Sequence, residues 1–212
     1  MKSITLLTFF LLLSGCASVK HPVNLGEAKE NVRDYYESGA FENECSNVAD
    51  GAIKFLESKS FNEQACAVFD IDETVLSNYK YTKDLGFGYT QSSWDEWQQK
   101  GISPAIKASR RLYNYLLSKK IHIIFLTGRE LKYFEATKNN LINAGFTKFD
   151  SLIVRAAGEE KIPAAEFKSD KRKALVNKGF NIVASVGDQE SDSYDGNTGY
   201  IIRIPNYLYL LD

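Results

Sequence analysis

Two aspartates placed two residues apart, Asp70 and Asp72, directly follow a short apolar run in this sequence. Carboxylates this close repel one another unless a cation or a proton lies between them. A second acidic loop, residues 187–192, also follows an apolar run and contains Asp188 and Asp192. Such oxygen ligands suit a hard cation such as Mg²⁺. Taken alone, each loop could equally be a solvated turn.

Residues able to bind an oxyanion follow other apolar runs. Thr127 and Gly128 end one of them, and a hydroxyl with free backbone N–H groups at a helix start would hold a phosphate oxygen. The alternative there is an ordinary strand-to-helix turn capped by Thr127. In a basic stretch further on we favour Lys168, which stands where a helix is expected to begin, and Lys161 and Lys171 remain alternatives.

Aromatic residues are concentrated between Tyr79 and Gly101. Trp94 and Trp97 are three residues apart in an expected short helix after Ser93, so they could present one aromatic face over a site. Rings that line a site would favour substrates with a flat ring. The alternative for each ring is packing against the core.

The elements that must position these residues are five short apolar runs that resemble buried strands. They comprise residues 65–69, 121–126, 152–154, 182–186 and 200–204. Helical spacing lies between most of them, which predicts an α/β fold with a parallel sheet covered by helices on both faces. Ligands bind such sheets beyond the carboxyl ends of the strands, where the polar motifs stand.

Helix ends can also be read from the sequence. Ser103 and Ser169 are expected N-caps, and Gly145 and Gly179 are expected helix stops. Before the first strand the spacing predicts two helices separated near Gly39. His122, flanked by isoleucines inside a strand, is expected to be structural rather than catalytic.

The N-terminus resembles a signal peptide, because Lys2 precedes an apolar stretch too short to span a bilayer. It ends in Leu-Ser-Gly-Cys at Cys16, similar to the lipobox of bacterial lipoproteins, in which the cysteine is acylated. We therefore expect a signal peptide at 1–15, a lipid-anchored tether at 16–26 and one domain at 27–212. This predicts a bacterial cell envelope location, with the outer membrane favoured.

The overall charge is nearly balanced, with a formal net charge of −1. It gives no electrostatic footprint for nucleic acid. Cys45 and Cys66 would face an oxidising compartment after export, so a disulfide and two buried thiols are both open alternatives.

Four segments together resemble the haloacid dehalogenase (HAD) superfamily of phosphatases. They are the DxDxT sequence from Asp70, the strand-end Thr127, Lys168 and the GDxxxD sequence that ends at Asp192. The residues around these motifs are similar to the acid phosphatase branch of the superfamily, subfamily IIIB. The similar segments are Phe-Asp-Ile-Asp-Glu-Thr-Val-Leu-Ser-Asn, Leu-Thr-Gly-Arg, Phe-Lys-Ser-Asp-Lys-Arg and Arg-Ile-Pro-Asn. That branch holds plant vegetative storage proteins and bacterial class C lipoprotein phosphatases. Glu190 and Tyr207 depart from its usual tryptophan and proline.

The resemblance implies a Rossmann-like core with a small cap insertion after the first strand, and an enzyme that hydrolyses phosphate monoesters. It implies Mg²⁺ held by Asp70, the backbone carbonyl of Asp72 and Asp188. Asp70 would form an aspartyl-phosphate, and Asp72 would protonate the leaving group and then activate water. Thr127, Gly128 and Lys168 would bind the phosphate. Aromatic rings of the insertion, with Tyr79, Trp94 and Trp97 as candidates, would favour nucleoside monophosphates or aryl phosphates.

Asp192 would orient Lys168 or the groups around the metal.

Two other functions use the same fold. One is a surface or storage protein without turnover, and the other is phosphotransfer to an alcohol.

Overall fold

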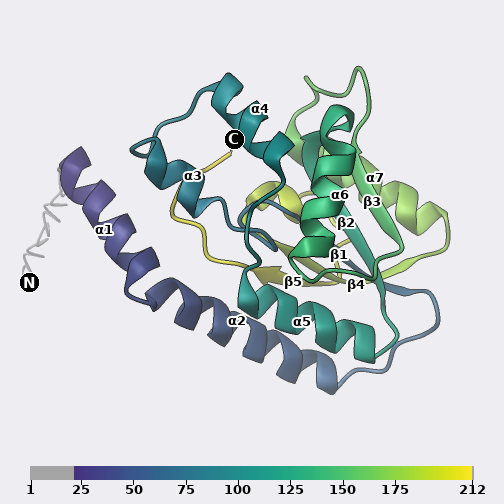
Figure 1. The fold of residues 1–212 in the computed structure, drawn as a ribbon. Helices are drawn as coiled ribbons and strands as arrows, with labels where there is room; N and C mark the ends of the chain where they lie inside the picture. The colour runs from purple at the N-terminus through teal and green to yellow at the C-terminus, as the bar shows by residue number, and fades with distance from the viewer. Residues whose placement is uncertain (1–21, 212) are drawn as a thin grey trace, which may run out of the picture.

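The computed structural model describes residues 22–211, so the expected signal peptide and Cys16, the expected acylation site, lie outside the described residues. Five strands form one parallel sheet in the order β3-β2-β1-β4-β5 (Figure 1). The strands are β1 (Ala65–Phe69), β2 (His122–Glu130), β3 (Ser151–Arg155), β4 (Asn181–Gly187) and β5 (Tyr200–Arg203). This confirms the predicted α/β fold and all five predicted strands.

The helices of the described chain precede β1, follow it as an insertion, or connect later strands. They are α1 (Leu25–Glu37), α2 (Ala40–Glu57), α3 (Tyr79–Asp84), α4 (Gln91–Lys100), α5 (Lys107–Ser118), α6 (Phe134–Asn143) and α7 (Ala164–Asn177). Short 3₁₀ turns lie at η1 (Leu131–Tyr133) and η2 (Glu190–Asp192).

Alternate residues of each strand point to opposite faces of the sheet, so each face needs its own apolar cover. On one face Phe69 and Phe125 pack with Leu56 of α2 and Leu112 of α5. On the other face a smaller cluster joins the strands to α7. It consists of Cys66, Val68, Ile124, Leu126, Phe167, Leu175 and Ile182. The strands therefore read as continuous apolar runs because both faces are covered.

The strand order reverses between β1 and β4, because the chain moves from β1 to β2 and β3 on one side and returns to β4 and β5 on the other. The crevice at such a switch point is where open α/β sheets bind ligands. Asp70 follows β1 and Asp188 follows β4. Topology alone therefore brings the two acidic loops together.

The two N-terminal helices meet at Gly39, whose φ of 90° is a left-handed conformation that favours glycine. Helix α1 begins at Leu25, capped by the Asn24 side chain, so the last two residues of the expected tether are helical. In Figure 1, α1 extends away from the sheet, whereas α2 runs along it. Among residues 22–211, no helix combines the length and apolarity needed to cross a bilayer.

Gly145 and Gly179 follow the ends of α6 and α7 with positive φ, which confirms the predicted helix stops. Both serine N-caps were wrong. Ser103 precedes an extended stretch and donates its hydroxyl to Asn78, so α5 starts only at Lys107. Ser169 lies inside α7, because that helix already begins after Pro163.

Cys45 and Cys66 are both buried free thiols, and they belong to the clusters on opposite faces of the sheet. Of the two alternatives, a disulfide or two buried thiols, the structure therefore shows two buried thiols. His122 is half-exposed and its Nδ1 lies 2.7 Å from Asp150 Oδ1, at the opposite end of the strands from the acidic loops. This agrees with its expected structural role.

Candidate active site

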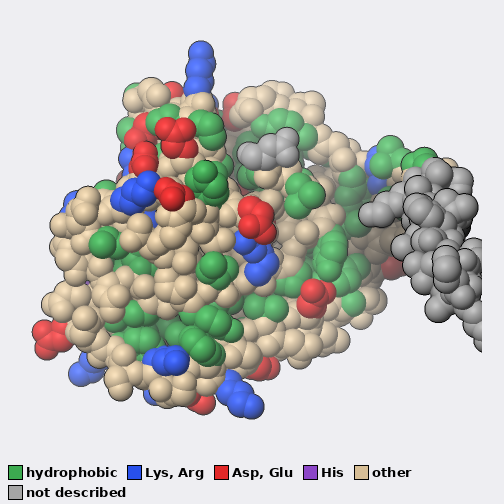
Figure 2. All heavy atoms as spheres, turned by 180° about the vertical axis from the view of Figure 1, so that it is seen from behind, with side chains coloured by type: hydrophobic (Ala, Val, Ile, Leu, Met, Phe, Trp, Pro, Cys, Tyr) green, Lys and Arg blue, Asp and Glu red, His purple; other side chains and the backbone are tan. Residues whose placement is uncertain are grey.

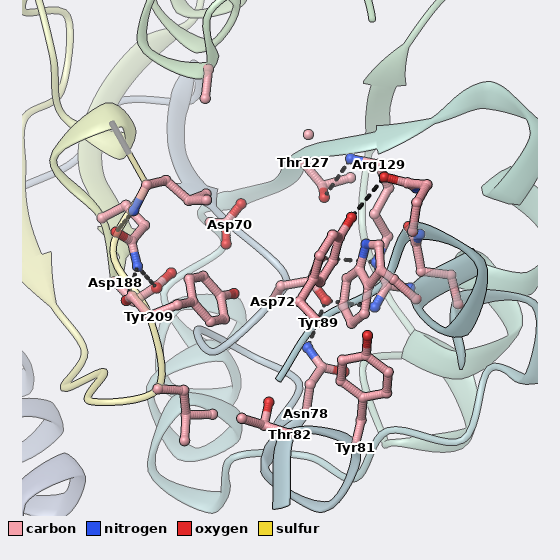
Figure 3. Close-up of a pocket in the computed structure, with 18 of the residues that line it drawn as sticks. Asp70, Asp72, Asn78, Tyr81, Thr82, Tyr89, Thr127, Arg129, Asp188 and Tyr209 are labelled. Atoms are coloured by element: carbon pink, nitrogen blue, oxygen red, sulfur yellow. Dashed lines mark hydrogen bonds and ion pairs between the residues drawn. The ribbon is translucent and has the colours of Figure 1, made fainter. Parts of the chain in front are cut away.

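The carboxyl ends of β1 and β4 carry a compact acidic cluster. Asp70, Asp188 and Asp192 each offer an oxygen within 4.8 Å of the others, and all three side chains are buried. Figure 3 shows Asp70 between Asp188 on one side and Thr127 on the other. Three carboxylates this close suit a divalent cation held by oxygen ligands. We call Asp70, Asp188, Asp192 and Lys168 the catalytic floor.

Hydrogen bonds from three different segments hold Asp188 in place. Thr74 Oγ1 donates to Oδ1 at 3.0 Å, while the amides of Gln189 and Asn206 donate to Oδ2 at 2.5 and 2.7 Å. Gly187 is required beside it, because a Cβ at this position would lie 2.2 Å from Asp192 Oδ2. The loop thus fixes both aspartates relative to the strand.

Lys168 reaches the cluster from the second turn of α7. Its Nζ donates to Asp70 Oδ1 and to Asp192 Oδ1, both at 2.5 Å. The expected position at the mouth of the helix was wrong by about one turn, but the side chain is long enough to reach the cluster. Lys161 and Lys171 make no contact with these aspartates within residues 22–211, and Lys171 pairs with Glu159 instead.

The catalytic floor contains more carboxylates than cationic groups, which favours the binding of additional positive charge. Burial raises the pKa of Asp70 well above its usual range, Lys168 opposes this, and the nearby Asp192, Asp188 and Asp72 raise the pKa further. Burial and the Asp192 charge likewise raise the pKa of Asp188. One lysine does not balance these carboxylates, so the residues present fit a site completed by a metal ion.

The Asp72 side chain contacts Arg129, a residue of the Leu-Thr-Gly-Arg motif to which the sequence pattern assigns no role. The guanidinium holds Asp72 with a two-pronged contact, Nε to Oδ2 at 3.0 Å and Nη2 to Oδ1 at 2.6 Å. Burial opposes the charge on Asp72, but Arg129 and the amide of Asn78 outweigh it and lower the pKa of Asp72. In this arrangement Asp72 is therefore ionised, whereas a leaving-group acid must carry a proton.

Thr127 and Gly128, the residues predicted to bind phosphate, line the same cavity as Asp70. The expected helix start was wrong, because β2 continues to Glu130 with a shift of register after Leu126. Thr127 Oγ1 accepts a hydrogen bond from the backbone N–H of Arg129 at 3.2 Å. The groups predicted to bind an oxyanion therefore lie at an irregular strand end.

Asn78 is a buried residue that hydrogen-bonds several other side chains, and the sequence pattern assigns it no role. Its Oδ1 accepts hydrogen bonds from Trp97 Nε1 at 2.8 Å and Ser103 Oγ at 2.7 Å, and its Nδ2 donates to Asp72 at 2.8 Å. One side chain thus ties the insertion to the catalytic motif. Only the short Ser-Asn ending of the quoted motif marked this position.

The C-terminal segment lines another side of the cavity. Tyr209 donates its hydroxyl to Glu73 at 2.6 Å, and burial with the Asp72 charge raises the pKa of Glu73 to about 8. Asn206 binds Asp188 from the same segment. The resemblance of the Arg-Ile-Pro-Asn segment was the only sequence signal for these contacts.

Above the floor lies a cavity of about 730 Å³. Its aromatic side consists of Tyr81, Phe87, Tyr89 and Trp94, which we call the cap wall. Of the three rings expected to lie over the site, Trp94 lines this cavity, whereas Tyr79 and Trp97 do not. Tyr79 stacks on Tyr36 at 4.6 Å between ring centroids. Trp97 is buried and bonded to Asn78, because the helix turns it inward.

Charges outside the cavity are mixed. Figure 2 shows basic and acidic side chains interspersed on one face of the molecule. On this face no continuous basic path for a nucleic acid backbone is seen.

Comparison with known proteins agrees with this geometry. Residues 15–211 match the family described as HAD superfamily, subfamily IIIB (acid phosphatase). Acid phosphatase 1 of Solanum lycopersicum is 32% identical over 191 residues, which cover 87% of this chain and 75% of the relative. The stem 28 kDa glycoprotein of Glycine max is 33% identical over the same shares.

The fold also resembles a solved structure, the class C acid phosphatase from Bacillus anthracis with tungstate bound. The TM-score is 0.70 at 22% identity, covering 89% of this chain and 87% of that chain. This supports the fold, and the family match and relatives support the activity. The resemblance seen in the sequence is confirmed, and the chain belongs to subfamily IIIB of the HAD superfamily, the acid phosphatases, as a phosphomonoesterase.

Proposed function

We propose that this phosphatase is Mg²⁺-dependent and hydrolyses phosphate monoesters through an aspartyl-phosphate on Asp70. The observation that carries the proposal is the contact of Asp70 with Lys168 inside a buried cluster of three aspartates. Asp70, Asp188 and the backbone carbonyl of Asp72 would hold the metal. When bound, Mg²⁺ supplies positive charge against the repulsion between a phosphate dianion and a carboxylate.

The chain's own residues then divide the reaction between them. Lys168, the Thr127 hydroxyl and the backbone N–H of Gly128 stabilise the phosphoryl oxygens. A carboxylate oxygen of Asp70 attacks phosphorus, the P–O ester bond breaks, and the leaving oxygen takes a proton from Asp72. Asp72 must leave Arg129 to carry that proton. In the second half Asp72 removes a proton from water, the water oxygen attacks phosphorus, and the bond between phosphorus and the Asp70 oxygen breaks, which releases phosphate and restores the Asp70 carboxylate.

The test is phosphate release from a panel of phosphomonoesters with Mg²⁺, after EDTA treatment, and after Mg²⁺ is restored. Asp70→Asn is expected to lose on the order of 10⁴-fold in rate, because a nucleophile is deleted. Asp170→Asn, on the exposed side of α7, is the matched control and should keep full activity. Undiminished turnover in Asp70→Asn would contradict the mechanism.

Two alternatives are decided by the same assay. A storage protein on this fold would release no phosphate from any substrate with the metal present. A phosphotransferase would convert an added alcohol to its phosphate ester faster than it releases inorganic phosphate. The presence of Asp70 with its buried lysine favours hydrolytic chemistry over a storage role.

We further propose that Cys16 is acylated and anchors the protein to the bacterial envelope, in the outer membrane. The support is the Leu-Ser-Gly-Cys sequence after an apolar stretch. Cys16→Ser should release the protein from membranes in fractionation without changing the rate of the folded domain. An unmodified N-terminus elsewhere in the intact mass would contradict this proposal.

A further inference from the structure

The cavity contains a second guanidinium, Arg155 at the end of β3, whose role is not explained by the chemistry above. Its side chain is 7% exposed and lines the cavity together with Gly128 and Arg129. Nη1 donates to the backbone carbonyls of Glu159 at 2.6 Å and Ile162 at 2.8 Å. The guanidinium also stacks over Phe167, 4.5 Å from the ring centroid. These contacts fix the plane of the group.

The other edge of Arg155 is free. Within residues 22–211, Nε and Nη2 make no hydrogen bond, and neither is among the polar atoms sealed from solvent without a partner. Arg129 uses the same two atoms to bind Asp72. A fixed guanidinium with an empty Nε/Nη2 edge is arranged to bind a planar oxyanion with two parallel hydrogen bonds.

The position of this edge separates it from the scissile phosphate. Arg155 Nε lies 3.8 Å from where a Cβ on Gly128 would be, so it reaches the proposed phosphate-binding residues of β2 from β3, whereas Asp70 follows β1 on the other side of β2. β3 lies two strands from β1, so the backbones that carry Arg155 and Asp70 are roughly 10 Å apart at the usual strand spacing. A group bound there belongs to the leaving part of the substrate.

We propose that Arg155 binds a carboxylate on the leaving group, so that the preferred substrates are phosphomonoesters of hydroxy acids. A carboxylate suits the place better than a second phosphate, because Glu130 and Glu160 also line the cavity and repel a doubly charged group more strongly. Glu130 is paired with Lys132, and Glu160 accepts the backbone N–H of Gly158. Neither occupies the Arg155 edge.

This inference rests on the proposed phosphatase function and is tested with three ring-matched substrates. They are phenyl phosphate, 3-carboxyphenyl phosphate and 4-carboxyphenyl phosphate, compared by kcat/KM with Mg²⁺. The full chain is expected to prefer at least one carboxylated ester by about tenfold or more, the size of a charge-assisted hydrogen bond. Arg155→Gln should remove that preference while phenyl phosphate changes less than about threefold. Arg155→Lys should keep part of it, because the charge remains but the two-pronged edge does not.

Lys171→Gln is the matched control, because it breaks the bond to the Glu159 side chain in the same loop and leaves the Arg155 edge intact. Its preference should equal that of the unmodified chain. If the unmodified chain prefers neither carboxylated ester, the proposal is overturned. Equal losses for all three esters in both Arg155 variants would also overturn it, since Arg155 would then act on the scissile phosphate. No turnover of any ester would contradict the phosphatase function itself, and this inference with it.

Discussion

The catalytic floor and the cap wall face each other across one cavity but are built differently. Asp70 and Lys168 of the floor expose only 7% and 6% of their surface, and each is held by partners from other elements. Tyr89 of the cap wall is 62% exposed. The floor is thus rigid and set by strand ends, whereas the wall belongs to an insertion that can vary without disturbing the sheet. Chemistry and substrate choice are therefore expected to respond to different substitutions.

Lys168→Met should give the largest separation between the two regions. It removes the positive charge that faces the phosphoryl oxygens, so kcat should fall by about 10²- to 10³-fold for every substrate alike. Steady-state kinetics on several phosphomonoesters provide the measurement. Lys171→Met, one turn along the same helix, is the control and should stay near the original rate. A loss limited to some substrates would assign Lys168 to specificity instead.

Asn78→Ala should break the connection between floor and wall. It leaves the Trp97 and Ser103 donors without their acceptor and removes a donor to Asp72. The free energy of unfolding should fall by about 2 to 4 kcal/mol, because several buried polar groups lose partners. Urea unfolding measures this. Asn114→Ala, on the exposed face of α5, should change it by less than about 0.5 kcal/mol. Equal free energies of unfolding in both variants would show that the hydrogen bonds of Asn78 do not stabilise the fold.

Trp94→Ala should affect the wall alone. Because Trp94 lines the cavity, its loss should lower the preference for a nucleoside monophosphate over glycerol phosphate by about tenfold. Trp97→Ala should leave that ratio unchanged and lower the unfolding temperature, since Trp97 is buried against Asn78. The ratio of kcat/KM values is the measurement. An unaltered ratio in Trp94→Ala would remove this ring from substrate recognition.

The smallest effect should come from His122, which belongs to neither region. The hydrogen bond to Asp150 raises the pKa of His122 above its usual 6.5. Its stabilisation is therefore complete below the unfolded pKa of about 6.5 and is lost as pH rises through the higher folded pKa. The pair is more than a third exposed, so the contribution should stay below about 1 kcal/mol. Unfolding free energies at pH 5.5 and pH 8.5 should differ less in His122→Gln than in the unmodified chain. An equal difference in both would contradict the assignment.

The sequence by itself determined the sheet and the meeting of Asp70, Asp188 and Lys168. Buried parallel strands appear as short apolar runs, and the carboxyl ends of neighbouring strands must converge. Polar residues directly after these runs therefore identified Asp70, Asp188 and Asp192 without any knowledge of loop paths, whereas Lys168 was favoured from its place in a basic helix.

Only the tertiary structure decided the partners of those residues. Arg129 meets Asp72 across 57 positions, and Tyr209 meets Glu73 across 136. The inward turn of Trp97 and the free edge of Arg155 likewise depend on how the insertion and the loop after β3 pack. Local spacing carries no information about such contacts, because they are fixed by which surfaces the whole chain buries together.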